Sequence, residues 1–172
     1  MSRALLLMAL IALSGAAPRS PVTGWDEVAW PFARDAWPAG RAFRCRDCDL
    51  DVYIRPKLGF CNCTTGVTDD AEVDAVSDLD MISPEFDPAG PGGGVAAAGL
   101  LGRARDYTIR APGGLRNAVG VALSSQCDLL VAAALGRDAD RARVTALLES
   151  APMAAWISRE LGRAQRSATL VP

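Results

Sequence analysis

Four of the chain's five cysteines lie close together, as a CxxC pair, Cys45 and Cys48, and a CxC pair, Cys61 and Cys63. Thiols at this spacing can ligate a metal, exchange electrons as a redox pair, or form structural disulfides. The sequence contains no histidine, which excludes Ser–His and Cys–His nucleophilic pairs and every His-ligated zinc or copper site. Any acid–base chemistry is therefore left to carboxylates, the single lysine, tyrosines or thiols.

The N-terminus indicates the redox compartment. An early Arg3 is followed by an apolar run, residues 4–13, and then by small residues around Ala16. This pattern predicts a secretory signal peptide over residues 1–16, and the run is about half the length of a membrane span. We therefore expect an exported protein, periplasmic or secreted, with no membrane span after signal cleavage.

Compartment and spacing together favour disulfides, since exported domains of modest size commonly oxidise their cysteines. We expect two bridges among Cys45, Cys48, Cys61 and Cys63, in which each residue of the CxxC pair bonds one residue of the CxC pair. Cys127 is then a buried free thiol. The alternative is a zinc or copper site of four thiolates, because the spacing resembles a zinc ribbon; otherwise no cofactor is expected.

Redox catalysis is the least favoured use of these thiols. The CxxC leads directly into a strand, whereas a redox motif opens a helix whose dipole lowers the pKa of the first thiol. Arg44 and Arg46 would favour a thiolate, but Asp47 and Asp49 offset them.

An acidic segment, residues 69–80, is the second place where chemistry could occur. Asp69 and Glu72 form the pattern of a capping box, which predicts a short helix. The EF-hand pattern for calcium does not fit, so a solvated helix face is favoured. The alternative is a carboxylate-based exported enzyme, in which acids of this segment would converge on one pocket.

Partners are constrained by charge and aromatic content. The formal net charge is −2, and no basic block appears, so we expect no nucleic-acid partner. Three tryptophans lie within residues 24–40. We interpret this segment as an arm whose rings pack on the core, and an aromatic ligand platform is the alternative.

The elements that must position these residues follow from hydrophobic periodicity. A half-buried strand at residues 51–55 turns at residues 56–59 and returns through Phe60 as a hairpin. One or two strands follow over residues 95–110, then an amphipathic helix from Leu115 and a buried strand over residues 127–135, which together suggest a right-handed crossover.

Two further helices begin at Asp138 or Asp140 and at Pro152, and the last ends at Gly162. The fold class is therefore α+β: a single domain over residues 17–162, with a Cys-rich β-hairpin followed by a small mixed sheet packed with C-terminal helices. Residues 163–172 are expected to be a flexible tail.

The function these features favour is an exported, disulfide-stabilised, non-catalytic accessory or binding domain with an unknown protein or small-molecule partner. The alternatives are the thiolate metal-binding protein that uses zinc or copper and the carboxylate-based exported enzyme.

Overall fold

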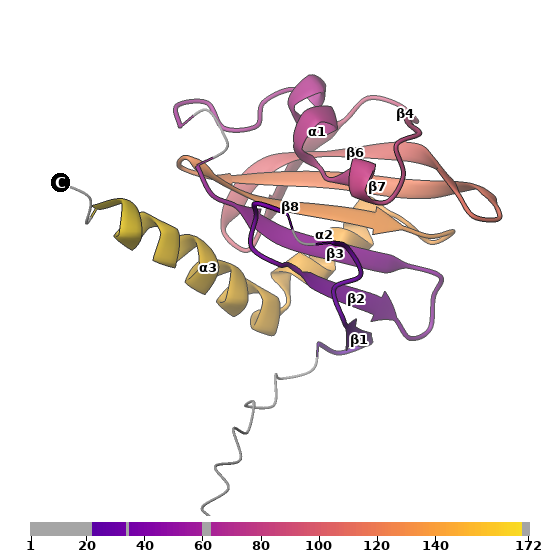
Figure 1. The fold of residues 1–172 in the computed structure, drawn as a ribbon, viewed down its shortest axis with the longest axis horizontal. Helices are drawn as coiled ribbons and strands as arrows, with labels where there is room; N and C mark the ends of the chain where they lie inside the picture. The colour runs from indigo at the N-terminus through magenta and orange to yellow at the C-terminus, as the bar shows by residue number, and fades with distance from the viewer. Residues whose placement is uncertain (1–21, 34, 60–62, 170–172) are drawn as a thin grey trace, which may run out of the picture.

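The structure, a computed structural model, describes residues 22–33, 35–59 and 63–169, with side chains through residue 162. In these residues one antiparallel sheet has the strand order β1-β2-β3-β8-β7-β6-β4, and β5 also pairs with β6 (Figure 1). The strands are β1 (Trp25–Val28), β2 (Arg41–Cys45), β3 (Asp51–Lys57), β4 (Phe86–Pro88), β5 (Gly93–Ala97), β6 (Leu100–Ala111), β7 (Gly114–Ser125) and β8 (Asp128–Leu135).

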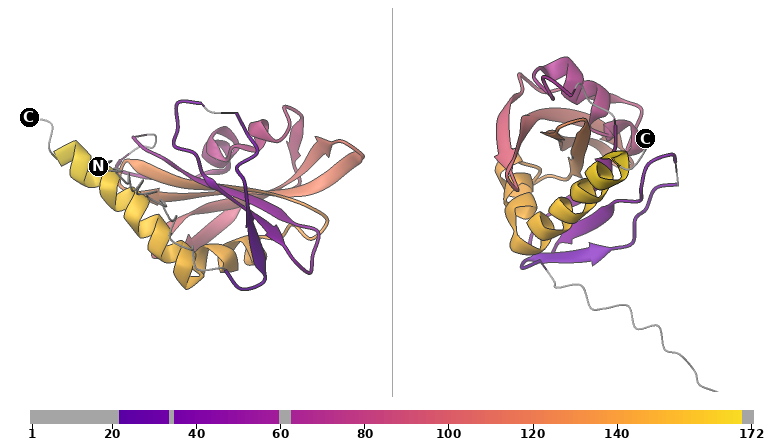
Figure 2. Two further views of the ribbon diagram at one scale, coloured as in Figure 1. Left: turned by 60° about the horizontal axis from the view of Figure 1, so that its bottom comes forward. Right: turned by 90° about the vertical axis from the view of Figure 1, so that its left-hand side faces the viewer.

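Helices cover both faces of the sheet. The left view of Figure 2 shows α1 (Asp70–Val76) on one face and α2 (Arg141–Glu149) with α3 (Ala151–Thr169) on the other. A short 3-10 turn, η1 (Leu79–Met81), follows α1. The predicted α+β fold of a single domain, with its longer helices at the C-terminal end, is confirmed.

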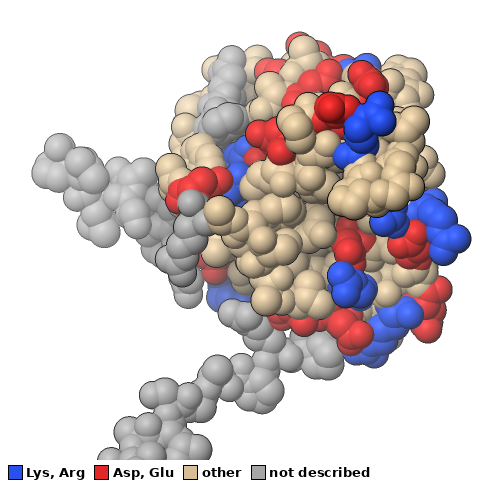
Figure 3. All heavy atoms as spheres, turned by 45° about the vertical axis from the view of Figure 1, so that its right-hand side comes forward, with Lys and Arg blue, Asp and Glu red and all other residues tan. Residues whose placement is uncertain are grey.

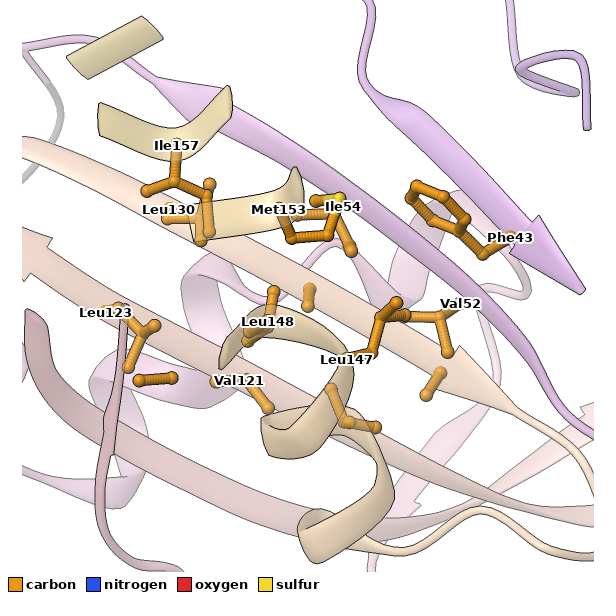
Figure 4. Close-up of a cluster of buried hydrophobic side chains, with 14 of the residues drawn as sticks. Phe43, Val52, Ile54, Val121, Leu123, Leu130, Leu147, Leu148, Met153 and Ile157 are labelled. Carbon is orange, nitrogen blue, oxygen red and sulfur yellow. The ribbon is translucent and has the colours of Figure 1, made fainter. Parts of the chain in front are cut away.

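The main core lies between the sheet and the α2–α3 pair. Figure 4 shows side chains of β3, β7 and β8 pointing at side chains of the two helices, and all of those it labels are at most 1% exposed. The labelled residues are Phe43, Val52, Ile54, Val121, Leu123, Leu130, Leu147, Leu148, Met153 and Ile157. A second cluster on the opposite face joins Val73 and Val76 of α1 to Ala122, Leu129 and Val131.

The prediction of an amphipathic helix from Leu115 is wrong. Residues 114–125 form β7, which pairs antiparallel with both β6 and β8. Residues 118–123 are all buried because α1 covers one face of the strand and α2 and α3 cover the other. In a strand buried on both faces the apolar run is continuous, so a helical spacing within it is a coincidence. The predicted crossover is also wrong, because β7 lies between β6 and β8 and is antiparallel to both.

The hairpin expected to return from β3 is also corrected. Leu58 and Gly59 do form a turn, and residues 60–62 lie outside the described residues. However, β3 already has β2 on one side and β8 on the other. The hairpin that contains β3 joins it to β2, and the CxxC runs from the last residue of β2 into the turn.

The helix starts were predicted better than the ends. The capping box of Asp69 and Glu72 is confirmed, and the Asp140 side chain accepts hydrogen bonds from the first turn of α2. The expected end at Gly162 is wrong, because the α3 backbone continues to Thr169. No helix in the described part of the chain has both the length and the apolar character that crossing a membrane requires.

The core makes a simple prediction about stability. Leu148 is 0% exposed under the sheet, so Leu148→Ala should lower the free energy of unfolding by about 3 kcal/mol, through lost burial and a cavity. Leu101→Ala is the matched control, because Leu101 is 73% exposed and should change stability by less than about 0.5 kcal/mol. Urea denaturation of the oxidised protein measures both. Equal losses would contradict this placement of the core.

Candidate functional site

Two disulfides are present, which confirms the expectation of disulfide bonds, but their connectivity differs from the one predicted. Cys45 bonds Cys48, and Cys63 bonds Cys127. The prediction that the CxxC and CxC residues pair with each other is therefore wrong for these three cysteines, and so is the prediction of a free thiol at Cys127. Cys61 lies outside the described residues.

The fold explains both bonds. Cys45 ends β2, and its N–H donates to the Leu50 carbonyl across the β2–β3 turn, which brings Cys48 back beside it. Cys127 lies in the tight turn between β7 and β8, at the other end of the sheet. The chain near Cys63 reaches that turn, where the Val67 N–H donates to Ser124 Oγ at 2.8 Å. This turn was not predicted from the sequence, because a helix was expected from Leu115 in place of β7.

The two bonds should contribute very differently to stability. Cys63 and Cys127 are 64 residues apart and Cys45 and Cys48 only 3 apart. The chain-entropy model gives about 4 kcal/mol for the long loop and about 2 kcal/mol for the short one. We expect Cys63→Ser/Cys127→Ser to lower the free energy of unfolding by about twice as much as Cys45→Ser/Cys48→Ser. Guanidinium denaturation measures this difference, and an equal or reversed order would contradict it.

The metal and enzyme alternatives find little geometric support. Cys45, Cys48 and Cys63 are in disulfides, and the described residues contain no group of three or more acids or cysteines placed to hold a metal ion. Three acids of the 69–80 segment pair with basic side chains of the sheet, and two of them, Asp70 and Asp74, share Arg105. Asp70 binds Arg103, Asp74 binds Arg105 and the Tyr107 hydroxyl, and Asp78 binds Arg55.

Asp78 anchors a buried ionic cluster between β3 and the end of α1. The Arg55 guanidinium donates to both oxygens of Asp78, at 2.6 and 3.0 Å, and to Asp35 at 2.6 Å. Lys57 pairs with Asp78 and donates to the Val76 carbonyl at 2.9 Å. Burial alone would lower the pKa of Arg55, but the hydrogen bonds to Asp78 and Asp35 outweigh it and raise that pKa. The cluster is thus a charge-balanced structural unit.

The tryptophan-rich segment packs beside this cluster. Trp30 contacts Phe32 and Tyr53 edge to face, with ring centroids 5.3 and 6.3 Å away. Trp30 and Trp37 also line a small pocket of about 160 Å³ over Asp35 and Arg55. Trp25 of this segment packs against the main core, as expected of an arm, whereas Trp30 contacts rings outside that core cluster. The small pocket at Trp30 and Trp37 is the feature that an aromatic platform would use.

A larger hollow lies at the end of the sheet that carries the Cys45–Cys48 bond. Three loops meet there, those joining β2 to β3, β6 to β7, and β8 to α2 (Figure 1). They enclose an open groove of about 870 Å³, called here the loop-end groove. Its lining is Arg46, Asp47, Cys48, Asp49, Pro112, Gly113, Leu115, Arg116, Arg137 and Asp138. On the face drawn in Figure 3, acidic and basic side chains are likewise interspersed.

Asp49 holds the three loops of this groove together. Its carboxylate accepts from Arg116 Nη2 at 2.7 and 2.8 Å and from Arg137 Nε at 2.9 Å. Its backbone N–H donates to the Asp138 carboxylate at 2.8 Å. The hydrogen bonds from Arg137 and then Arg116 lower the pKa of Asp49. In the sequence, Asp49 is recognisable only as a charge that offsets Arg44 and Arg46.

The lowered pKa of Asp49 predicts a pH dependence. A group whose folded pKa lies below its unfolded value of about 3.9 stabilises the fold above that pH, and loses this effect as the pH falls through the folded pKa. Asp49→Asn should therefore be less stable than the wild type near neutral pH, and the difference should shrink below about pH 4.

Urea denaturation at about pH 7 and about pH 3 provides the measurement for Asp49. Asp47→Asn is the matched control, since Asp47 lines the same groove and forms no hydrogen bond or ion pair within the described part of the chain. A stability difference for Asp49→Asn that is independent of pH, or one that Asp47→Asn reproduces, would contradict the assignment.

Comparison with known proteins assigns no family. No family model and no curated protein matches the chain. Among solved structures, it is similar to the solution structure of cyanobacterial PsbP (CyanoP) from Synechocystis sp. PCC 6803. That alignment has 13% identity and a TM-score of 0.43, and covers 70% of this chain and 72% of the other. At this level, no functional argument passes from that protein to this chain.

Proposed function

We propose that the protein is an exported, disulfide-stabilised binding domain, and that its binding surface is the loop-end groove. Two disulfides in so small a domain support an oxidising compartment, periplasmic or extracellular. The observation that carries the proposal is the groove itself, whose walls come from three distant parts of the chain and are fixed by the contacts of Asp49.

The dimensions and rim of the groove fit a peptide segment of another exported protein. The groove is wide open and lined mostly by charged side chains, so it suits a surface segment of a protein partner and not an enclosed small molecule. Leu115 at the groove is 66% exposed, and a solvated leucine of this kind gains free energy when a partner covers it. The partner therefore carries an apolar side chain that packs on Leu115.

Two arginines supply the polar part of recognition. Arg116 uses only Nη2, and Arg137 only Nε and its backbone N–H, to bind Asp49. Their remaining guanidinium N–H groups have no partner among the described residues. Guanidinium groups bind carboxylates through pairs of N–H donors, and arginine is enriched among residues that dominate binding energy. An acidic residue of the partner is thus expected beside its apolar one.

Site-specific photo-cross-linking tests this surface. A photoreactive residue in place of Leu115 should give a discrete covalent adduct with an exported protein of the native host. The same residue in place of Leu101, the other large exposed hydrophobic side chain of the described structure, should give none. Arg116→Ala/Arg137→Ala should reduce the adduct at position 115 by about tenfold or more, the loss of about 1.4 kcal/mol of affinity.

Arg110→Ala is the control for the arginine variant, because Arg110 is 64% exposed and pairs with Glu85 outside the groove. It should leave the adduct unchanged. Equal cross-linking from positions 101 and 115 would contradict a specific binding surface at this end of the sheet. So would an adduct at position 115 whose yield is unchanged in Arg116→Ala/Arg137→Ala.

A further inference from the structure

The two disulfides differ in how strongly the fold protects them from reduction. A bond that favours folding is, by the same free energy, harder to reduce in the folded protein. Cys45 and Cys48 close a loop with a sequence separation of only 3, against 64 for Cys63 and Cys127. From loop length alone, the short bond should be roughly 70-fold easier to reduce at equilibrium.

The position of the Cys45–Cys48 bond determines from which side the thiol of a partner can approach it. Cys45 ends β2 and donates its N–H to Leu50. Cys45 and Cys48 are both half-buried and both pack against the main core. Cys48 lines the loop-end groove, which is open to solvent. An incoming thiolate therefore reaches the sulfur of Cys48 through the groove, and Cys45 is the leaving group.

The charges around Cys48 also differ from those the sequence suggested. Asp49, its neighbour in the chain, is held by Arg116 and Arg137 and so is neutralised. Both guanidinium groups share the groove wall with Cys48. Nearby arginines favour the thiolate over the thiol. Arg44 and Arg46 pair with Asp51 and Asp26, and Asp138 joins Asp47 in the groove wall. The positive charge beside Cys48 therefore comes from Arg116 and Arg137, which share the single carboxylate of Asp49.

We propose that Cys45–Cys48 is a thiol–disulfide exchange site that oxidises a dithiol of another exported protein. A partner thiolate attacks Sγ of Cys48 and forms a mixed disulfide, and the Cys45–Cys48 bond breaks with Cys45 leaving as thiolate. The partner's second thiolate then attacks the partner's first sulfur in the mixed disulfide, and Cys48 leaves as a thiolate. Two electrons pass to the cysteine pair, and the two protons lost by the partner are taken up by Cys45 and Cys48.

This exchange rests on the proposed function only in that the groove must admit a partner. A small dithiol enters the groove without specific binding, so the chemistry can be measured separately. The protein carries a Cys61→Ser change, which prevents reshuffling by the fifth cysteine. It is equilibrated with mixtures of reduced and oxidised dithiothreitol, and alkylation followed by mass spectrometry reports the state of each cysteine.

Cys45 and Cys48 should become half reduced at a ratio of reduced to oxidised dithiothreitol at least tenfold lower than Cys63 and Cys127 require. The far-UV circular dichroism should be unchanged at that lower ratio. Cys63→Ser/Cys127→Ser should keep this first transition, and Cys45→Ser/Cys48→Ser should lose it. Reduction of both bonds at one ratio, of Cys63–Cys127 first, or of Cys45–Cys48 only with unfolding, would overturn the proposal.

The direction of attack has its own test. With oxidised glutathione as probe, Cys48 in the Cys45→Ser variant should form the mixed disulfide at least tenfold faster than Cys45 in the Cys48→Ser variant. Equal rates or the reverse order would overturn the assignment of Cys48 as the attacked sulfur. If the reduction order holds while position 115 gives no cross-link, the exchange site stands and the binding surface fails.

Discussion

Strands β7 and β8 lie between α1 on one side and the α2–α3 pair on the other, so both faces of their central residues are covered. Their side chains there are mostly alanine, valine and leucine, and the strands can carry chemistry only at their ends. One end bears Cys127 in the β7–β8 turn, and the opposite end opens into the loop-end groove. The two disulfides thus lie at opposite ends of the sheet.

Close packing and charge pairing shape the groove. A Cβ on Gly136 would lie 1.9 Å from the Asp49 carbonyl oxygen, so the β8–α2 loop approaches the β2–β3 turn as closely as only glycine permits. Asp49 then binds Arg116 and Arg137 through its carboxylate. The turn that carries Asp49 is closed by Cys45–Cys48, so the proposed exchange site and the groove are parts of one turn.

The sequence contained enough to predict the fold class and the apolar strand β8, because a short apolar run and a capping box are local signals. It could not separate β7 from a helix, because a strand buried on both faces lacks the alternation that identifies a strand. Because a helix was predicted in place of β7, the β7–β8 turn that holds Cys127 was missed, and so was the disulfide of Cys127. The groove could not be predicted for a different reason. Asp49, Arg116 and Arg137 are distant in the sequence, and only the strand order shows that they lie side by side.

The connectivity of the cysteines is what both the groove and the exchange chemistry depend on. Proteolysis of the oxidised protein without reduction, followed by mass spectrometry of the linked peptides, measures it directly. We expect one peptide closed by Cys45–Cys48 and one pair of peptides joined by Cys63–Cys127. Peptides that join Cys45 or Cys48 to Cys61 or Cys63, with Cys127 alkylated as a free thiol, would contradict it.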